Sequence, residues 1–205
     1  MDNDNAPRLI LASGSPARRA MLQKAGVVCD VMISDVDEET IKAAMMSESD
    51  CVEAADIATV LAAEKALSIA KANPACYVIG SDQVLALGRR MFSKARTMDE
   101  ARETLDILRG RTHELVSAVA IARNDEIIWH DVDTAIMTMR HVSNDFLATY
   151  LAHMRPNALN SVGCYEIEGL GVQLFSEVEG DFFTVLGMPL LPLLEQLRHF
   201  GLVKS

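Results

Sequence analysis

The stretch "LILASGSPARRAMLQKAG", residues 9–26, joins a short apolar run to a segment with helical periodicity. Residues 9–11 are typical of the end of a buried strand, and apolar residues recur at helical spacing over residues 21–25. Ser15 precedes Pro16, an order in which serine caps a helix and proline takes its first position without losing a needed N–H group. The stretch therefore predicts a strand that leads directly into a helix, the repeating unit of α/β proteins.

The same junction carries groups that bind anions. Backbone N–H groups at a helix start attract negative charge, and Ser13, Ser15, Arg18 and Arg19 would add side-chain donors. The alternative is an ordinary strand-to-helix junction whose arginines are solvated, and this stretch alone does not separate the two interpretations.

Strand and helix patterns alternate along the rest of the chain. Further strands are expected over residues 28–34, 75–87, 113–123, 126–139, 171–180 and 182–187, and helices over residues 50–72, 97–110, 144–154 and 190–200. Several strands in the second half follow one another without an intervening helix, which favours a mixed rather than a parallel sheet. The predicted fold is α/β: a mixed twisted sheet with flanking helices, in two lobes around a central groove.

The charge balance limits the partners that this chain would bind. It has 19 lysines and arginines against 29 aspartates and glutamates, a net charge of −10, which argues against binding along a nucleic-acid polymer. No apolar run reaches the roughly 18 residues of a membrane span. The polar start "MDNDNAPR" does not resemble a signal peptide. These features predict a cytoplasmic protein that binds neither nucleic-acid polymer nor membrane and leave a small phosphorylated ligand open.

Cysteine and histidine residues show no metal-ligand spacing. The four cysteines are scattered without a C-x-x-C pair, which indicates neither a zinc site nor a disulfide framework. The histidines and the single tryptophan are interpreted as surface or packing residues. These residues are Cys29, Cys51, Cys76, Cys164, His113, His130, His141, His153, His199 and Trp129.

Asp82 interrupts an apolar strand pattern in "VIGSDQVLAL", residues 78–87. A buried carboxylate is costly unless another group compensates it. A second acidic cluster, residues 35–39, follows an earlier strand, and one acid from each segment would be able to hold a divalent cation between them. The alternatives are a solvated cluster that starts a helix and an Asp82 satisfied by backbone donors.

Two lysines lie in unusual contexts. Lys65 belongs to the Ala-rich segment "LAAEKAL", and Lys94 to the connector "MFSKART" before a predicted helix. Either would neutralise a phosphate as a point charge. The alternative for each is an exposed lysine or one whose stem covers apolar surface.

Together these motifs resemble the Maf proteins, which are nucleoside triphosphate pyrophosphatases. The resemblance runs from about residue 9 to residue 197 and rests on "LILASGSPARRAMLQKAG", "DVDE", "AAEKA", "VIGSDQVLALG", "FSKA", "LRGRTHE", "GCYEIEGLG" and "EGDFFTVLGMPL". It implies one Maf-like domain over residues 1–205 with a flexible polar N-terminus over residues 1–7. It also implies a fold related to the inosine triphosphate pyrophosphatases, a homodimer, and a Mg²⁺- or Mn²⁺-dependent reaction that releases a nucleoside monophosphate and pyrophosphate.

The resemblance assigns roles to individual residues. Glu38 and Asp82 would hold the metal, and Asp82 would also accept a proton from the attacking water. A strongly metal-bound carboxylate is a poor base, so the alternative is that Asp82 acts mainly as a ligand. The triphosphate would be bound by Ser13, Ser15, Arg18, Lys65 and Lys94.

Three departures from the common family pattern concern the base. Gln83 and Glu168 resemble the branch that hydrolyses 7-methylguanosine triphosphate, and a carboxylate accepts two hydrogen bonds from the guanine N1–H and amino groups. That branch usually carries a large aromatic residue where this chain has Ala17, which is unable to stack on a cationic base.

Two other functions stay open at this point. One is a phosphatase or nucleotide-sugar hydrolase that uses the same groups and does not release pyrophosphate. The other is a nucleotide-binding regulator of cell division or septum formation with little catalytic activity.

Overall fold

The computed structural model describes residues 8–48 and 51–204. The predicted first strand and helix are confirmed as β1 (Leu9–Ala12) and α1 (Pro16–Lys24). Ser15 caps α1, its Oγ accepting from the Arg18 backbone N–H at 3.5 Å, and Pro16 occupies the first turn. The N-terminus predicted to be flexible, residues 1–7, lies outside the described residues.

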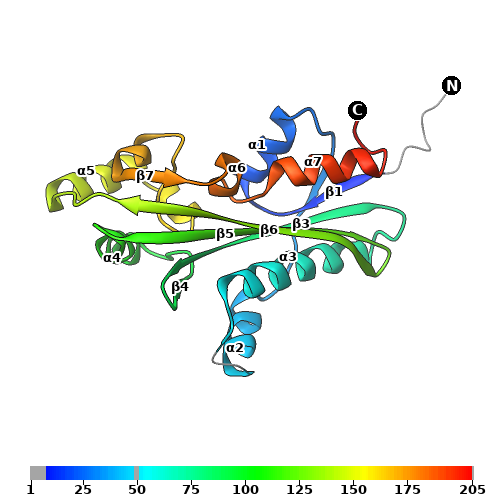
Figure 1. Cartoon of the computed structure of the whole chain (residues 1–205), viewed down its shortest axis with the longest axis horizontal. Helices are drawn as coiled ribbons and strands as arrows, with labels where there is room; N and C mark the ends of the chain where they lie inside the picture. The colour runs from blue at the N-terminus through cyan, green and yellow to red at the C-terminus, as the bar shows by residue number, and fades with distance from the viewer. Residues whose placement is uncertain (1–7, 49–50, 205) are drawn as a thin grey trace.

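One mixed sheet of seven strands organises the fold (Figure 1). Its order is β2-β1-β3-β5-β6-β7, and β4 pairs with β3 away from this path. β1 runs parallel to β2 and β3, whereas all other pairs are antiparallel, which confirms the predicted mixed sheet. The strands after β1 are β2 (Asp30–Met32), β3 (Tyr77–Leu87), β4 (Arg90–Phe92), β5 (Thr112–Arg123), β6 (Glu126–Met139) and β7 (Phe175–Glu179).

Helices cover both faces of the sheet (Figure 1). α3 lies on one face, α1, α6 and α7 lie on the other, and α4 and α5 lie together near one end. The helices after α1 are α2 (Glu38–Glu48), α3 (Ala54–Ala70), α4 (Met98–Leu108), α5 (Asn144–Met154), α6 (Phe182–Val185) and α7 (Leu190–His199). None of the described helices is long and apolar enough to cross a membrane.

The central strand β3 is buried on both faces, which explains its nearly continuous apolar sequence. Ile79 packs in the core beneath α1 and α7, whereas Val78 packs in the core with α3. A Cβ on Gly80 would lie 2.1 Å from the Ala62 carbonyl oxygen and 2.7 Å from the Ala66 nitrogen. Glycine at this position therefore allows α3 to lie directly against β3.

Separate hydrophobic cores support the two predicted lobes. One core lies between β1, β3, α1 and α7, and another contains Leu105 of α4, Tyr150 of α5 and Cys164. The cavities described below lie between α1 and the chain that follows α5.

The strand predicted over residues 182–187 is wrong, because these residues form the short helix α6 and the turn after it. Asp181 caps α6, its Oδ1 accepting from the backbone N–H groups of Phe183 and Thr184. Gly187 has φ +105°, a conformation that ends the helix and that glycine adopts readily. Local capping thus outweighs the strand preference of "FFTVLG".

Other predictions need smaller corrections. The strand predicted over 28–34 is only three residues long, and the first part of the strand predicted over 171–180 is the 3₁₀ helix Leu170–Leu174. The helix predicted from residue 50 begins at Ala54, and residues 49–50 lie outside the described part of the chain. The sequence analysis did not predict α2 or β4. α2 buries none of its residues fully; Ile41 and Met45, one turn apart, form only a short apolar stripe that is partly buried against the core beside α3.

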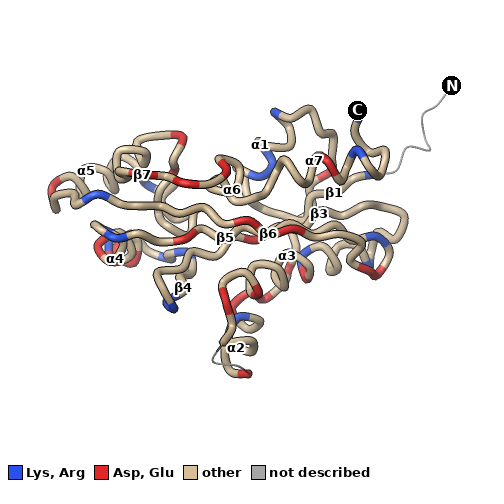
Figure 2. Tube along the Cα trace, in the orientation of Figure 1, with Lys and Arg blue, Asp and Glu red and all other residues tan. Residues whose placement is uncertain are grey.

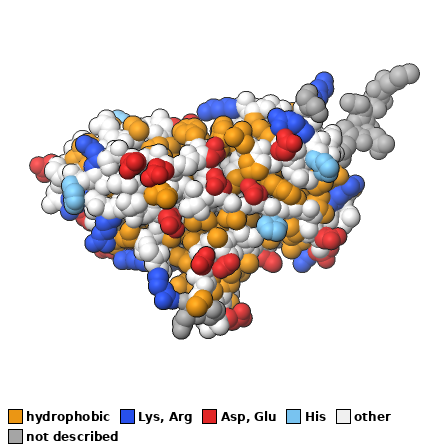
Figure 3. Space-filling view, in the orientation of Figure 1, with side chains coloured by type: hydrophobic (Ala, Val, Ile, Leu, Met, Phe, Trp, Pro, Cys, Tyr) orange, Lys and Arg blue, Asp and Glu red, His pale blue; other side chains and the backbone are white. Residues whose placement is uncertain are grey.

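None of the cysteines in the described part of the chain forms a disulfide. His113 is buried, and the other four histidines are exposed. Lysine, arginine and acidic residues are interspersed along the trace in Figure 2. On the face shown in Figure 3, the described side chains form no continuous basic patch.

Candidate active site

Two adjoining cavities lie in the groove between the lobes. The first, here called the charged cavity, has a volume of about 210 Å³, and the second, the large cavity, about 450 Å³. The large cavity falls within the range of small-molecule sites. The residues that line both cavities are Ser15, Ala17, Gln83, Asn160, Ser161, Val162 and Leu186.

Lys65 stands between two carboxylates in the charged cavity. Its Nζ lies 2.6 Å from Glu38 Oε1 and 2.6 Å from Asp82 Oδ1. Asp82 comes from β3, Lys65 from α3 and Glu38 from the first turn of α2. Lys65 and Asp82 are both buried, so the compensation that the sequence analysis expected for Asp82 is this ammonium group.

Arg18 is buried beside this cluster. Its Nε donates to the Gly187 carbonyl oxygen and its Nη1 to the Ser81 carbonyl oxygen, both at 2.8 Å. Nη1 also contacts Ser13 Oγ at 3.4 Å. These bonds leave Nη2 as the guanidinium nitrogen available to a ligand. Ser13 lies behind Arg18 and does not line the charged cavity, whereas Ser15 does.

The cavity shifts the ionisation of its charged groups. Desolvation, followed by the nearby charge of Arg18, lowers the pKa of Lys94. Desolvation also lowers the pKa of Arg18. Burial alone would raise the pKa of Glu38, but the ammonium groups of Lys65, Lys42 and Lys94 outweigh burial and lower it. Glu38 is therefore held as a carboxylate, and the cations are concentrated where an anion would relieve their repulsion.

The structure brings together Ser15, Arg18, Glu38, Lys65, Asp82 and Lys94 around the charged cavity, as the family resemblance implied. It also adds residues that the sequence analysis missed. Lys42 lies on α2, 3.6 Å from Glu39 Oε1, and Ser93 Oγ donates to the same oxygen at 2.8 Å. Arg96 lines the cavity as well. The signal for Lys42 was its position four residues after Glu38, which becomes informative only once α2 is identified as a helix.

The lining of the charged cavity is net positive. It contains the five basic residues Arg18, Lys42, Lys65, Lys94 and Arg96 against the three acidic residues Glu38, Glu39 and Asp82. The whole chain carries a net charge of −10, so this cavity opposes the sign of the molecule. Such a local reversal attracts a small anion into the groove.

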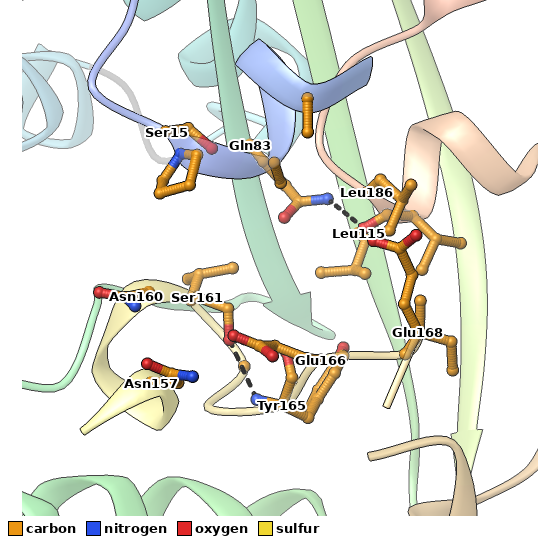
Figure 4. Close-up of a pocket in the computed structure, with 17 residues that line it drawn as sticks. Ser15, Gln83, Leu115, Asn157, Asn160, Ser161, Tyr165, Glu166, Glu168 and Leu186 are labelled. Atoms are coloured by element: carbon orange, nitrogen blue, oxygen red, sulfur yellow. Dashed lines mark hydrogen bonds between the residues drawn. The ribbon is translucent and has the colours of Figure 1, made fainter. Parts of the chain in front are cut away.

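In the large cavity, Gln83 is held in one orientation. Its Nε2 lies 3.1 Å from Ser117 Oγ, 3.0 Å from the Thr184 carbonyl oxygen and 3.1 Å from the Val185 carbonyl oxygen. The Ser117 hydroxyl itself donates to the Thr184 oxygen at 2.8 Å. Because these acceptors occupy the amide nitrogen, the amide oxygen of Gln83 faces the cavity as an acceptor (Figure 4).

Glu168 reaches the same cavity from the segment that follows α5 (Figure 4). Its side chain is half exposed and lies 3.9 Å from Lys24 Nζ, a pair too exposed to hold the carboxylate firmly. Ala17 lies on α1 and lines the cavity with its methyl group. The three residues that distinguish family branches therefore surround one space.

A buried pair supports the wall of the large cavity. His113 Nε2 lies 2.7 Å from Tyr165 Oη, and His113 Nδ1 is buried without a hydrogen-bond partner. Burial lowers the pKa of His113 to about 4, so the ring is neutral at pH 7. Tyr165 lines the cavity and packs edge-on against Phe175.

The charged cavity has a donor set suited to a hard divalent cation. Among the described residues, no group of three or more histidines, cysteines, aspartates or glutamates is arranged to hold a metal by itself. Glu38 and Asp82 nevertheless contact the same ammonium group, so both carboxylates reach one position. Mg²⁺ commonly binds one or two carboxylates and takes its other ligands from water and substrate phosphates, a pattern that these residues fit.

The fold and the site define an α/β protein with a groove of cations and carboxylates next to a larger cavity. The family described as "Maf-like protein" matches residues 8–200, and the chain belongs to this family. A 7-methyl-GTP pyrophosphatase of Rhizobium meliloti is 46% identical over 97% of this chain and 99% of that protein. A nucleoside triphosphate pyrophosphatase of Granulibacter bethesdensis is 47% identical over 94% and 96%.

A solved nucleoside-triphosphatase / dITP/XTP pyrophosphatase of Mycobacterium abscessus matches 95% of both chains, with 13% identity and a TM-score of 0.39. This likeness is too distant to test the expected relation to the inosine triphosphate pyrophosphatases.

Proposed function

We propose that this protein is a nucleoside triphosphate pyrophosphatase, which hydrolyses its substrate to the nucleoside monophosphate and pyrophosphate. The observation that carries the proposal is the net positive charged cavity that opens into the large cavity. A triphosphate in the first would place its nucleoside in the second. The names of the relatives in Rhizobium meliloti and Granulibacter bethesdensis agree with this activity.

The basic residues would bind the triphosphate. Lys65, Lys94 and Arg18 line the charged cavity, and hydrogen bonds between charged groups and phosphate oxygens are stronger than neutral ones. Ser15 lies at the start of α1, where backbone N–H groups favour an anion. Glu38 and Asp82 would hold Mg²⁺ or Mn²⁺, which supplies charge neutralisation on the phosphoryl oxygens.

Asp82 would orient and deprotonate the attacking water. The water oxygen bonds to the α-phosphorus, the bridging α–β P–O bond breaks, the proton passes to Asp82, and pyrophosphate leaves. The Lys65 ammonium group donates to Asp82 Oδ1 at 2.6 Å and so fixes the position of this carboxylate in the cavity. Lys65 would turn from the carboxylates toward phosphate oxygens as the substrate binds.

The large cavity would favour a guanine-type base, with 7-methylguanosine triphosphate as the proposed substrate. The Gln83 amide oxygen and the Glu168 carboxylate both present acceptors. Guanine offers two adjacent donors at N1–H and the amino group. Thymine and uracil offer one N–H between two carbonyl oxygens, which would face these acceptors unfavourably.

A substrate panel tests the proposal. The purified protein would be incubated with 7-methylguanosine, guanosine, thymidine and uridine triphosphates with and without Mg²⁺, and pyrophosphate and orthophosphate would be measured separately. Metal-dependent release of pyrophosphate is expected. Release of orthophosphate alone would assign a phosphatase, and binding without release would assign a nucleotide-binding regulator.

The family resemblance also implies a homodimer, and the hydropathy and polar start of the sequence predict a cytoplasmic location. Both stay predictions, which sedimentation velocity and cell fractionation would test.

A further inference from the structure

A third pocket, here called the side pocket, adjoins the large cavity. Its volume is about 290 Å³. Four residues line both it and the large cavity: Ala17, Ala20, Glu168 and Leu186. Its remaining lining is almost wholly apolar and consists of Met21, Lys24, Ala25, Phe182, Phe183, Leu190, Leu191 and Leu194.

The side chains of α1 explain why the two spaces lie next to each other. Ala17 and Ala20 are three residues apart and therefore lie on one face of the helix, which both spaces share. Each side chain ends at its Cβ, so α1 contributes only two methyl groups to the boundary. Met21 and Lys24 continue this face along the side pocket.

The side pocket exposes apolar groups that the fold itself does not cover. Phe182 is 51% exposed and Leu191 is 57% exposed. The polar groups stand at its edge, where Lys24 and Glu168 form their weak pair. A cavity with polar acceptors at Gln83 and Glu168, next to a pocket lined by apolar side chains, is complementary to a ligand with a polar ring and an apolar substituent.

We propose that the side pocket binds an apolar substituent on the base of a nucleotide held in the large cavity. The substrate class would then extend beyond a methylated base to purine nucleoside triphosphates with a bulky apolar group, such as an aryl group, on the base edge. Engineered apolar cavities of about 150 Å³ already bind benzene, so the side pocket has room for an aryl group. This inference rests on the proposed function, because it assumes that the large cavity holds the base.

Binding of monophosphates tests the inference without relying on hydrolysis. Calorimetry would compare guanosine monophosphate with its N2-benzyl and N7-benzyl derivatives. At least one derivative is expected to bind about tenfold more tightly, since the ring leaves water for an apolar surface. Equal or weaker affinity for both derivatives would overturn the inference.

Leu191→Asp separates the side pocket from the large cavity, because Leu191 lines only the former. Leu191 lies in the first turn of α7, where an acidic residue is compatible with the helix. The variant is expected to lose the benzyl preference and to bind guanosine monophosphate as before. Val28→Asp is the matched control, since Val28 is 91% exposed and lies outside all three spaces.

The remaining outcomes are also decisive. A benzyl preference that persists in Leu191→Asp would overturn the inference. The inference would also be overturned if Leu191→Asp dissociated an oligomer and left the benzyl preference unchanged. That result would show that the side pocket binds a second copy of the chain. Pyrophosphate release from guanosine triphosphate is measured in parallel. If pyrophosphate is released but neither benzyl derivative binds more tightly, only this inference is wrong. If a benzyl derivative binds more tightly but no pyrophosphate is released, only the proposed function is wrong.

Discussion

At the scale of single residues, the candidate site depends on Lys65. Its ammonium group is buried and contacts Glu38 and Asp82 at equal distances of 2.6 Å. Two carboxylates around one buried cation compensate its desolvation, and removal of Lys65 would leave both carboxylates without the cation that they share. In the proposed reaction the Lys65 ammonium group also contacts phosphate. Lys65, Glu38 and Asp82 would therefore pair with one another before the substrate binds and contact the substrate or its metal afterwards.

Asp82→Asn should lower turnover at least about a hundredfold, the usual contribution of a general base. The amide keeps the shape of the side chain and removes its basicity and charge. Steady-state pyrophosphate release would be measured beside circular dichroism, which reports whether the variant folds. Asp125→Asn is the control, because it makes the same change at an exposed carboxylate that does not line the charged cavity. A folded Asp82→Asn with near-normal turnover would contradict the role of Asp82.

Lys65→Met and Lys94→Met should each weaken binding of a non-hydrolysable triphosphate analogue more than binding of the monophosphate. A charged hydrogen bond contributes about 1.5 to 3 kcal/mol, which is the expected size of the difference. Calorimetric titration with both ligands measures it. Equal losses for the two ligands would show that these lysines do not contact the β- or γ-phosphate.

Glu168→Gln should shift substrate preference toward thymidine and uridine triphosphates. The substitution places a donor where the carboxylate offers only acceptors, which matches a pyrimidine carbonyl oxygen. Competition assays with nucleotides at equal concentration measure the change. If the wild-type protein consumes thymidine or uridine triphosphate first, Glu168 does not select the base in this way.

At the scale of secondary structure elements, the contact between α3 and β3 positions the site. α3 carries Lys65 and β3 carries Asp82, and the backbones approach at Gly80. The site geometry therefore depends on a residue that takes no part in the chemistry. α6 has a similar role, because its carbonyl groups at Thr184 and Val185 orient Gln83.

Gly80→Ala should destabilise the fold by about 1 to 3 kcal/mol, the usual cost of forcing extra atoms into a packed core. The new Cβ would lie against backbone atoms of α3, which are unable to move aside as a flexible side chain would. Urea denaturation measures the free energy of unfolding. Gly169→Ala is the control, since the nearest atom to its new Cβ is the Glu166 carbonyl oxygen at 3.9 Å. Equal stability of the two variants would contradict the close approach.

At the scale of the whole molecule, stability should depend on pH through His113. This ring is 1% exposed and has a pKa of about 4, against an ordinary value of 6.5. As the pH falls below 6.5, His113 becomes protonated in the unfolded chain, whereas in the native state it stays neutral until about pH 4. The free energy of unfolding should therefore fall across this window, by up to roughly 3 kcal/mol from this residue.

His113→Gln should flatten that pH dependence, because glutamine contacts Tyr165 without titrating. Urea denaturation between pH 4 and pH 7 provides the measurement. His199→Gln, which changes an exposed histidine, should retain the wild-type slope. An unchanged slope in His113→Gln would show that another group controls stability in acid.

The sequence by itself determined the elements whose signals are local. Ser15 with Pro16 predicts the start of α1, and apolar periodicity predicts α5 with the bounds that the structure has. An aspartate within an apolar strand identified Asp82 as a special residue before any contact was known. These predictions succeeded because caps and periodicity depend on residues a few positions apart.

Only the tertiary structure decided which side chains of distant segments contact each other. Gln83 obtains its orientation from Thr184 and Val185, more than a hundred positions along the chain, and Lys65 finds Asp82 only because α3 packs at Gly80. α2 has no fully buried residue and only a short apolar stripe of Ile41 and Met45, so neither the helix nor the place of Lys42 beside Glu38 was predicted. The large cavity and the side pocket likewise adjoin because α1 packs beside α6 and α7. Contacts between distant segments depend on how elements pack, and no local pattern encodes that packing.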